Sequence, residues 1–199
     1  MYVLFLGLRH EVGGDWTGYL TITETISRSS LQESLDYQEP LYAFITWVST
    51  RLGLGVYGSN LLGAVIFCTG LFAFCARLPN RWLALAAATP FLVIVAVMSG
   101  NRQGMAIGVL LFVMSRWKEW GLTKRGLGTL LAGMFHSSAL LLLVLTILDL
   151  KINKVVKLIA VFVMAALAIW LVSRSEAVWY RYTTIYRTES HGAYSPGAI

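Results

Sequence analysis

Apolar and polar residues alternate along this chain in long blocks. After an apolar start at residues 1–8, apolar runs cover residues 41–54, 57–76, 82–98, 105–114, 127–148 and 158–172. The run at 57–76 has the roughly 20 residues that a helix needs to cross a hydrocarbon layer, whereas several others are shorter. Because backbone in lipid must satisfy its own hydrogen bonds, this pattern predicts an all-α, polytopic integral membrane bundle with short broken or re-entrant helices.

The composition points to lipid as the solvent. Of the 199 residues, 57% are hydrophobic and only 13% are charged, and the mean hydropathy is +0.66. Soluble domains contain about 45–50% apolar residues. The net charge of +6 comes from short basic clusters between apolar runs rather than from one basic face or tail. We therefore expect a lipid bilayer, and no nucleic acid, as the partner.

The charged segments predict the orientation of the chain. Lys and Arg gather at Arg77 and Arg81, at residues 116–125 and at residues 151–157, and basic loops of this kind remain in the cytoplasm. The segment 9–39 has six acidic residues and only two arginines, so we expect it to be an extracytoplasmic loop. The predicted location is a cytoplasmic membrane, which the chain crosses several times.

One apolar run is interrupted at His136, where Ser137 or Ser138 could cap a new helix. If both flanks of residues 126–149 are cytoplasmic, this segment enters and leaves on the same side as a hairpin of half-helices, with His136 near its tip. A single straight span is the alternative, and it would move residues 151–157 to the outside.

The two ends of the chain carry incomplete signals. Residues 1–8 are too few to span a membrane, and they lack the charged region and cleavage site of a signal peptide. Residues 190–199 are polar, and no closing helix follows. We expect residues 1–199 to form a single transmembrane domain that is a fragment of a longer polytopic protein.

Arg102 is the first candidate for chemistry. It lies between two short apolar runs, and an arginine at membrane depth is costly unless it is paired or faces a water-filled cavity. Its neighbours Asn101 and Gln103 make the turn polar enough to line such a cavity. The alternative is an ordinary charge at a helix end in the membrane interface.

His136 is the second candidate, because it is also embedded in an apolar run. Its imidazole can act as a general base, as a general acid or as a hydrogen-bond donor to a phosphate. Alternatively, it holds helices together by a hydrogen bond.

The acidic segment contains further candidates. Gly13 and Gly14 permit a tight turn that brings Asp15 close to Arg9 at the membrane surface, although a solvated loop explains the same composition. Glu39 precedes a proline that favours a helix start, so a role at the positive helix end is an adequate structural explanation for Glu39.

Several familiar types of site are excluded. Cys68 and Cys75 lie seven residues apart in one predicted helix, about 10 Å along its axis, which is too far for a disulfide. No zinc-type spacing of Cys and His occurs, and there is no Walker A, GxGxxG, GxSxG or HExxH motif. Glycines at Gly100, Gly104 and Gly108 have the spacing that lets helices pack closely.

Four short motifs follow one another along the chain and together resemble a known family. They are Arg9-x-x-x-Gly13-Gly14-Asp15-Trp16-x-x-Tyr19, Glu39-Pro40, Asn101-Arg102-Gln103-x-Met105-Ala106 and Phe135-His136-Ser137-Ser138-Ala139. In this order, and over most of the chain, they resemble the EpsG family of bacterial exopolysaccharide polymerases. The chain departs from that pattern in its shortened first helix, in its early end and in Gly14, where the family more often has threonine.

The resemblance implies a membrane glycosyltransferase of the Wzy kind in exopolysaccharide or capsule biosynthesis. Such a polymerase joins oligosaccharide repeat units carried on undecaprenyl pyrophosphate at the outer face of the bacterial cytoplasmic membrane, and other polysaccharide assembly proteins are possible partners. A pyrophosphate leaving group requires positive charge, which Arg9 and Arg102 would supply. Asn101, Gln103 and Tyr19 complete the expected substrate-binding set.

The attacking sugar hydroxyl must also lose a proton, and three residues compete for that role: His136, Asp15 and Glu39. We expect no cofactor and no tightly bound metal, although the acidic segment could hold a cation loosely. Two other classes of protein remain open. One is a flippase or other transporter of lipid-linked glycans, which needs no proton acceptor, and the other is a structural subunit of a polysaccharide export complex.

Overall fold

The computed structural model describes residues 1–149 and 153–174, and within these residues the chain is entirely helical. The elements in order are α1 (Tyr2–Gly7), α2 (Trp16–Arg28), α3 (Leu31–Tyr37), α4 (Pro40–Arg51), α5 (Gly55–Cys75), α6 (Arg81–Ala88), η1 (Thr89–Val97), α7 (Asn101–Ser115), α8 (Leu122–Gly133), η2 (Ser137–Leu142), α9 (Leu143–Leu148) and α10 (Lys154–Arg174). The chain divides into two compact units, residues 1–146 and residues 147–199, and the all-α prediction is confirmed for the described part.

The first unit is built around the pair of helices α5 and α7, whose contact is the most extensive in the chain. Glycines allow their backbones to approach closely. A Cβ atom at Gly70 would overlap the carbonyl oxygen of Gly108, and a Cβ atom at Gly108 would lie 2.5 Å from Cα of Phe67. Helix α1 lies along α5, and its residue Leu6 belongs to an apolar core that includes Phe67 and Leu71 of α5. The packing role expected for Gly108 is thus confirmed.

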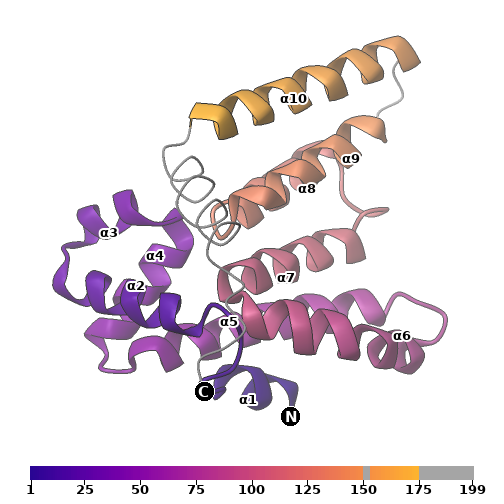
Figure 1. The fold of residues 1–199 in the computed structure, drawn as a ribbon. Coiled ribbons are helices and arrows are strands. Elements are labelled where there is room, and N and C mark those ends of the chain that lie inside the picture. Colours follow the sequence, from indigo (N-terminus) through magenta and orange to yellow (C-terminus); the bar gives the residue numbers. More distant parts are fainter. Residues whose placement is uncertain (150–152, 175–199) are drawn as a thin grey trace, which may run out of the picture. The chain divides into compact units, whose positions relative to one another are not determined.

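The helices α2, α3 and α4 gather at one end of α5, and the connection between α5 and α6 lies at the opposite end (Figure 1). At that opposite end, Nη1 of Arg77 forms an ion pair with Oε1 of Glu119 at 2.6 Å. This contact joins the α5–α6 connection to the α7–α8 connection, so two of the three basic segments lie side by side.

Most of the segment 9–39 is helical, because α2 and α3 lie within it, whereas its sequence predicts a polar loop. Helix α2 buries four residues at helical spacing: Trp16, Tyr19, Thr23 and Ile26. Helix α3 begins with a capping box, in which the backbone N–H of Glu33 donates to Ser30 Oγ and the carboxylate of Glu33 accepts from the backbone N–H of Ser30. The threonines, serine and glycine of α2 conceal this amphipathic pattern in the sequence.

Two breaks in the helices were expected from the sequence, and both are observed. Gly100 has an extended backbone and separates η1 from α7, so that Asn101 and Arg102 begin a new helix. His136 is likewise extended and separates α8 from η2. The expected serine cap is wrong, however, because His136 itself occupies the N-cap position of η2 and no side-chain hydrogen bond caps that helix.

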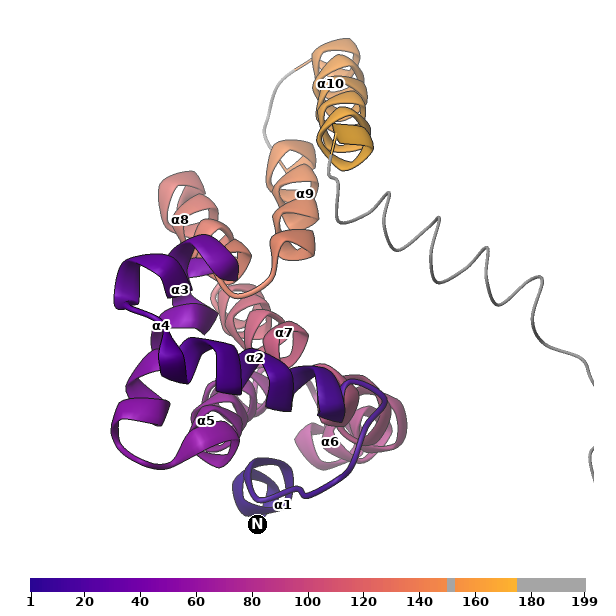
Figure 2. The same ribbon diagram turned by 60° about the vertical axis from the view of Figure 1, so that its left-hand side comes forward.

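Helices α8 and η2 pack against each other on either side of the turn at His136 (Figure 2). The arrangement has the form of the predicted hairpin. Among the described residues, one helix, Gly55–Cys75, is long and apolar enough to cross a membrane, and Arg81–Val97 and Ser137–Leu148 are shorter apolar helices. The multi-pass topology therefore stays a prediction.

Candidate functional site

The site forms where the start of α4 meets the turn between α8 and η2. The first N–H groups of a helix have no acceptor within the helix. In α4, the N–H of Leu41 donates to the carbonyl oxygen of Met134 at 3.0 Å, which fixes this turn against the helix start. Glu39 occupies the N-cap position of α4, with Pro40 at the first helical position as the sequence predicted. Two segments almost 100 residues apart thereby place Glu39 and His136 side by side.

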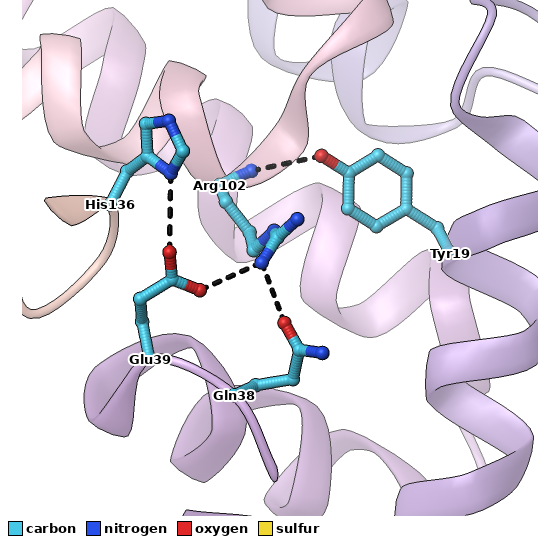
Figure 3. A network of polar contacts seen from close by, with 5 residues as sticks. All are labelled: Tyr19, Gln38, Glu39, Arg102 and His136. Atoms are coloured by element: carbon cyan, nitrogen blue, oxygen red, sulfur yellow. Dashed lines mark hydrogen bonds and ion pairs between the residues drawn. The ribbon is translucent and has the colours of Figure 1, made fainter. Parts of the chain in front are cut away.

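The carboxylate of Glu39 bridges the two residues that the sequence singled out independently (Figure 3). Its Oε1 lies 3.2 Å from Nδ1 of His136, and its Oε2 lies 2.7 Å from Nη1 of Arg102. The three side chains are partly buried, with 19% of Glu39, 22% of Arg102 and 29% of His136 exposed. A bridging carboxylate of this kind holds both partners in one orientation.

Arg102 is held from several sides, because it stands at the second position of α7, directly after the helix break. Its Nη1 also donates to Oε1 of Gln38 at 2.6 Å, and its backbone N–H donates to the hydroxyl oxygen of Tyr19 at 3.4 Å. The guanidinium carbon lies 5.8 Å from the centre of the Tyr42 ring. Among the described residues, Nε of Arg102 has no hydrogen-bond partner, so the guanidinium retains donor capacity.

The environment of Glu39 determines its charge. Burial by itself would raise the pKa of the Glu39 carboxyl group. The hydrogen bond from His136, the positive charge of Arg102 and the backbone N–H of Glu39 outweigh burial and lower this pKa from 4.5 to about 2. The group is therefore a carboxylate at neutral pH, and with so low a pKa it is a weak proton acceptor.

The charge of Glu39 also determines which nitrogen of His136 carries the proton. An ionised carboxylate only accepts hydrogen bonds, so the 3.2 Å contact requires the proton to be on Nδ1 of His136. A neutral ring then has its lone pair on Nε2. Figure 3 shows this second nitrogen directed away from Glu39. His136 is thus arranged to accept a proton at Nε2.

Arg9 lies apart from this bridge and is almost fully buried, with 6% of its surface exposed. Its Nη1 donates to the carbonyl oxygen of Val97 at 2.7 Å and its Nη2 donates to Oδ1 of Asn60 at 3.4 Å. Val97 ends η1, and a cation at a helix C-terminus stabilises its last carbonyls. In the described part of the chain no ion pair joins Arg9 to Asp15, contrary to our expectation. The placement favours a role of Arg9 in fixing the helix break before Arg102.

The remaining candidates are separated from one another. Asp15 is exposed and precedes α2 without a side-chain hydrogen bond to its helix. Gln103 is exposed, and Asn101 is buried against α5, where a Cβ atom at Gly63 would lie 2.5 Å from the Asn101 side-chain oxygen. The structure therefore brings together Tyr19, Glu39, Arg102 and His136, and it leaves Asp15, Gln103 and Asn101 outside their contacts.

Sequence reasoning missed three residues at or near the site. Gln38 was overlooked because nothing marks a glutamine before Glu39 as special. Tyr42 was counted as part of an apolar run, yet its ring lies fully buried beside Arg102. Asn60 had a visible signal, since an amide inside the run at 57–76 is costly in lipid. It is 2% exposed and accepts a hydrogen bond from Arg9.

The described residues contain no group of three or more His, Cys, Asp or Glu side chains that could hold a metal ion. The guanidinium of Arg102 supplies positive charge at the site. Independence from metal ions stays a prediction.

Comparison with family models matches residues 1–190 of the chain to the EpsG family. Neither the curated proteins nor the solved structures that were compared contain a match.

Proposed function

The chain belongs to the EpsG family of exopolysaccharide-related membrane proteins, and on this premise we propose that it polymerises oligosaccharide repeat units carried on undecaprenyl pyrophosphate. The observation that supports this proposal is the carboxylate of Glu39 bridging His136 and Arg102. One partner can accept a proton, and the other can bind an anion. A glycosyl transfer from a pyrophosphate donor needs both functions at one place.

His136 is the general base in this proposal. A sugar hydroxyl of one lipid-linked unit attacks the anomeric carbon of the donor glycan, and its proton passes to Nε2 of His136. The positive charge that forms on the ring is stabilised by Glu39 at Nδ1, so Glu39 acts as a positioning and charge-stabilising residue rather than as the base. We assign no such role to Asp15, which is exposed and precedes α2.

Arg102 binds the leaving group in this proposal. The bond between the anomeric carbon and the pyrophosphate oxygen breaks, and the lipid pyrophosphate leaves with the electron pair. A guanidinium offers several N–H donors to phosphate oxygens, and the bonds to Gln38 and Glu39 engage only Nη1. Tyr19 fixes the backbone of Arg102 in this orientation.

The proposed setting is a bacterial cytoplasmic membrane that the chain crosses several times, with the site at its outer face. The helix α5 has the length and hydropathy of a span. The ion pair between Arg77 and Glu119 keeps two basic connections on one side, opposite to α2, α3 and α4. This separation agrees with basic loops inside and an acidic segment outside.

The decisive experiment measures polymer in cells that lack the endogenous gene and produce the full-length protein or its His136→Ala variant at equal membrane abundance. Loss of the general base should lower the rate of polymerisation by about 10²–10⁴-fold. Long polymer should disappear while single lipid-linked units accumulate at the outer face. Accumulation at the inner face would instead identify a transporter, and unchanged polymer would favour a structural subunit.

A further inference from the structure

A second group of side chains with binding chemistry lies at the same end of the first unit as Glu39. The rings of His10 and Tyr57 stack at an interplanar angle of 26°, with 6.2 Å between their centres, and Nδ1 of His10 lies 2.6 Å from the Tyr57 hydroxyl. Trp16 meets the edge of His10 at 5.6 Å and lies 6.2 Å from Tyr57. Trp16 is buried, whereas 40% of Tyr57 is exposed. We call His10, Trp16 and Tyr57 the aromatic group.

The backbone next to the aromatic group is strained. Glu11 has φ +52°, a left-handed conformation that costs free energy for a residue other than glycine. This conformation places Oε1 of Glu11 3.8 Å from Nε2 of His10. An exposed carboxylate thus stands directly beside exposed rings, which is the combination that contacts a sugar through both its hydroxyls and its apolar face.

A hollow of about 440 Å³ opens between α2 and the connection of α4 to α5. Its size falls within the range of about 300–1,000 Å³ that is typical of small-molecule sites. Thr23, Ser27, Thr50 and Glu24 contribute its polar lining. The three hydroxyls donate to backbone carbonyls of their own helices, so their oxygens keep lone pairs that can accept hydrogen bonds.

The aromatic residues do not line the hollow themselves, but residues next to them in α2 and α5 do. Leu20 lines the hollow one helical turn beyond Trp16, and Val56 lines it directly before Tyr57. Helix α2 also carries Tyr19, which contacts Arg102. One helix therefore connects the aromatic group, the hollow and the site of the proposed reaction.

We propose that the aromatic group and this hollow form a subsite for an uncharged carbohydrate, namely sugars of the lipid-linked unit at some distance from the reacting bond. The Tyr57 ring supplies a face for the C–H groups of a sugar, and the acceptor oxygens and the carboxylates of Glu11 and Glu24 accept bonds from its hydroxyls. The carboxylate of Glu24 is paired with Nη2 of Arg28 at 2.6 Å, whereas the exposed carboxylate of Glu11 stands beside the aromatic group and disfavours acidic sugars there. The inference rests on the proposed polymerase function.

The experiment uses the full chain in nanodiscs and lipid-linked repeat units extracted from cells that lack the gene. Initial rates of polymer formation are measured against the concentration of these units for the wild type, Tyr57→Leu, Glu24→Gln and His136→Ala. Phe91→Leu is the matched control, since Phe91 is an aromatic residue with 72% exposure outside both sites. Tyr57 is partly exposed, so its replacement should not disturb the core.

We expect Tyr57→Leu to raise KM up to about tenfold with kcat within about twofold of the wild type, because an aromatic contact contributes to binding in the ground and transition states alike. Glu24→Gln should raise KM by a smaller factor, and Phe91→Leu should change neither constant. An unchanged KM in both Tyr57→Leu and Glu24→Gln, with His136→Ala inactive, would overturn the subsite and leave the polymerase standing. A wild-type protein that forms no polymer would overturn both proposals.

Discussion

The bridge at Glu39 makes its strongest prediction for the substitution Glu39→Gln. The amide keeps the size of the side chain and can still accept a hydrogen bond from His136, but it removes the negative charge between His136 and Arg102. A pKa lowered from 4.5 to about 2 corresponds to about 3 kcal/mol of stabilisation in the charged form. Since about a fifth of both Glu39 and Arg102 is exposed, solvent screening reduces the expected loss of unfolding free energy to about 1–3 kcal/mol.

The same substitution should lower the polymerisation rate by at least about tenfold, because Glu39 orients His136 and stabilises its protonated form, and so supports part of the roughly 10²–10⁴-fold contribution of a general base. Rates are measured with lipid-linked units in nanodiscs, and stability is measured by thermal unfolding in detergent. Glu119→Gln is the matched control. Glu119 also pairs with an arginine at 2.6 Å, but nearly half of it is exposed and it lies at the opposite end of α5, so we expect no measurable change.

Stability should also respond to pH with a defined sign. The pKa of Glu39 is lower in the folded protein than in the unfolded chain, so its stabilisation is complete above about pH 4.5 and is lost as the pH falls towards 2. The difference in stability between the wild type and Glu39→Gln should therefore be constant near neutral pH and shrink below about pH 4.5. A difference that stays constant down to pH 3, or a Glu39→Gln variant with more than a tenth of the wild-type rate, would refute the bridge as the source of these effects.

Three further predictions concern the surroundings of the bridge. Arg102→Lys should lower the polymerisation rate at least about tenfold, because an ammonium group lacks the planar fork with which a guanidinium bonds to Gln38 and Glu39 through one nitrogen and offers another to a phosphate. A rate near that of the wild type would point to a structural subunit. Gly13→Ala should destabilise the protein, since Gly13 has φ +96° and a Cβ atom there would lie 2.5 Å from the carbonyl oxygen of Met98. Gly14→Ala should not destabilise it, because a Cβ atom at Gly14 meets open space. Equal melting temperatures of the two variants would contradict this prediction. Activity should persist in an excess of chelator, and complete loss that added Mg²⁺ restores would show that a metal ion takes part.

A physical reason drew attention to Arg102 and His136 in the sequence, but nothing in the sequence indicated that Glu39 contacts both of them. Arg102 and His136 stand out because a charged or titratable side chain is costly inside an apolar run. Glu39 was a candidate base only through the family resemblance, since its place before Pro40 already had a structural explanation. The bond of Leu41 to Met134, which aligns α4 with the turn at His136, joins residues 93 positions apart and leaves no local trace in the sequence.

The amphipathic character of α2 was overlooked for a different reason. Its buried positions include Thr23, and threonine, serine and glycine fill many of its other positions, so the sequence of this segment resembles a polar loop. The pairing of Arg9 with Asp15 failed because it was inferred from proximity in sequence. Burial under α5 and η1 offered Arg9 the carbonyl oxygen of Val97 and the amide oxygen of Asn60 instead.

The sequence by itself determined the helical class and two helix breaks, one close to Gly100 and one at His136, and it put forward Arg102 and His136 among several candidates for anion binding and proton transfer. Each of these follows from local properties: the length of apolar runs, backbone preference and the cost of burying charge. Tertiary structure alone decided that Glu39 joins the two and that Asp15 does not. Ionisation and hydrogen bonding depend on groups that packing brings within about 3 Å, and these groups come from distant parts of the chain.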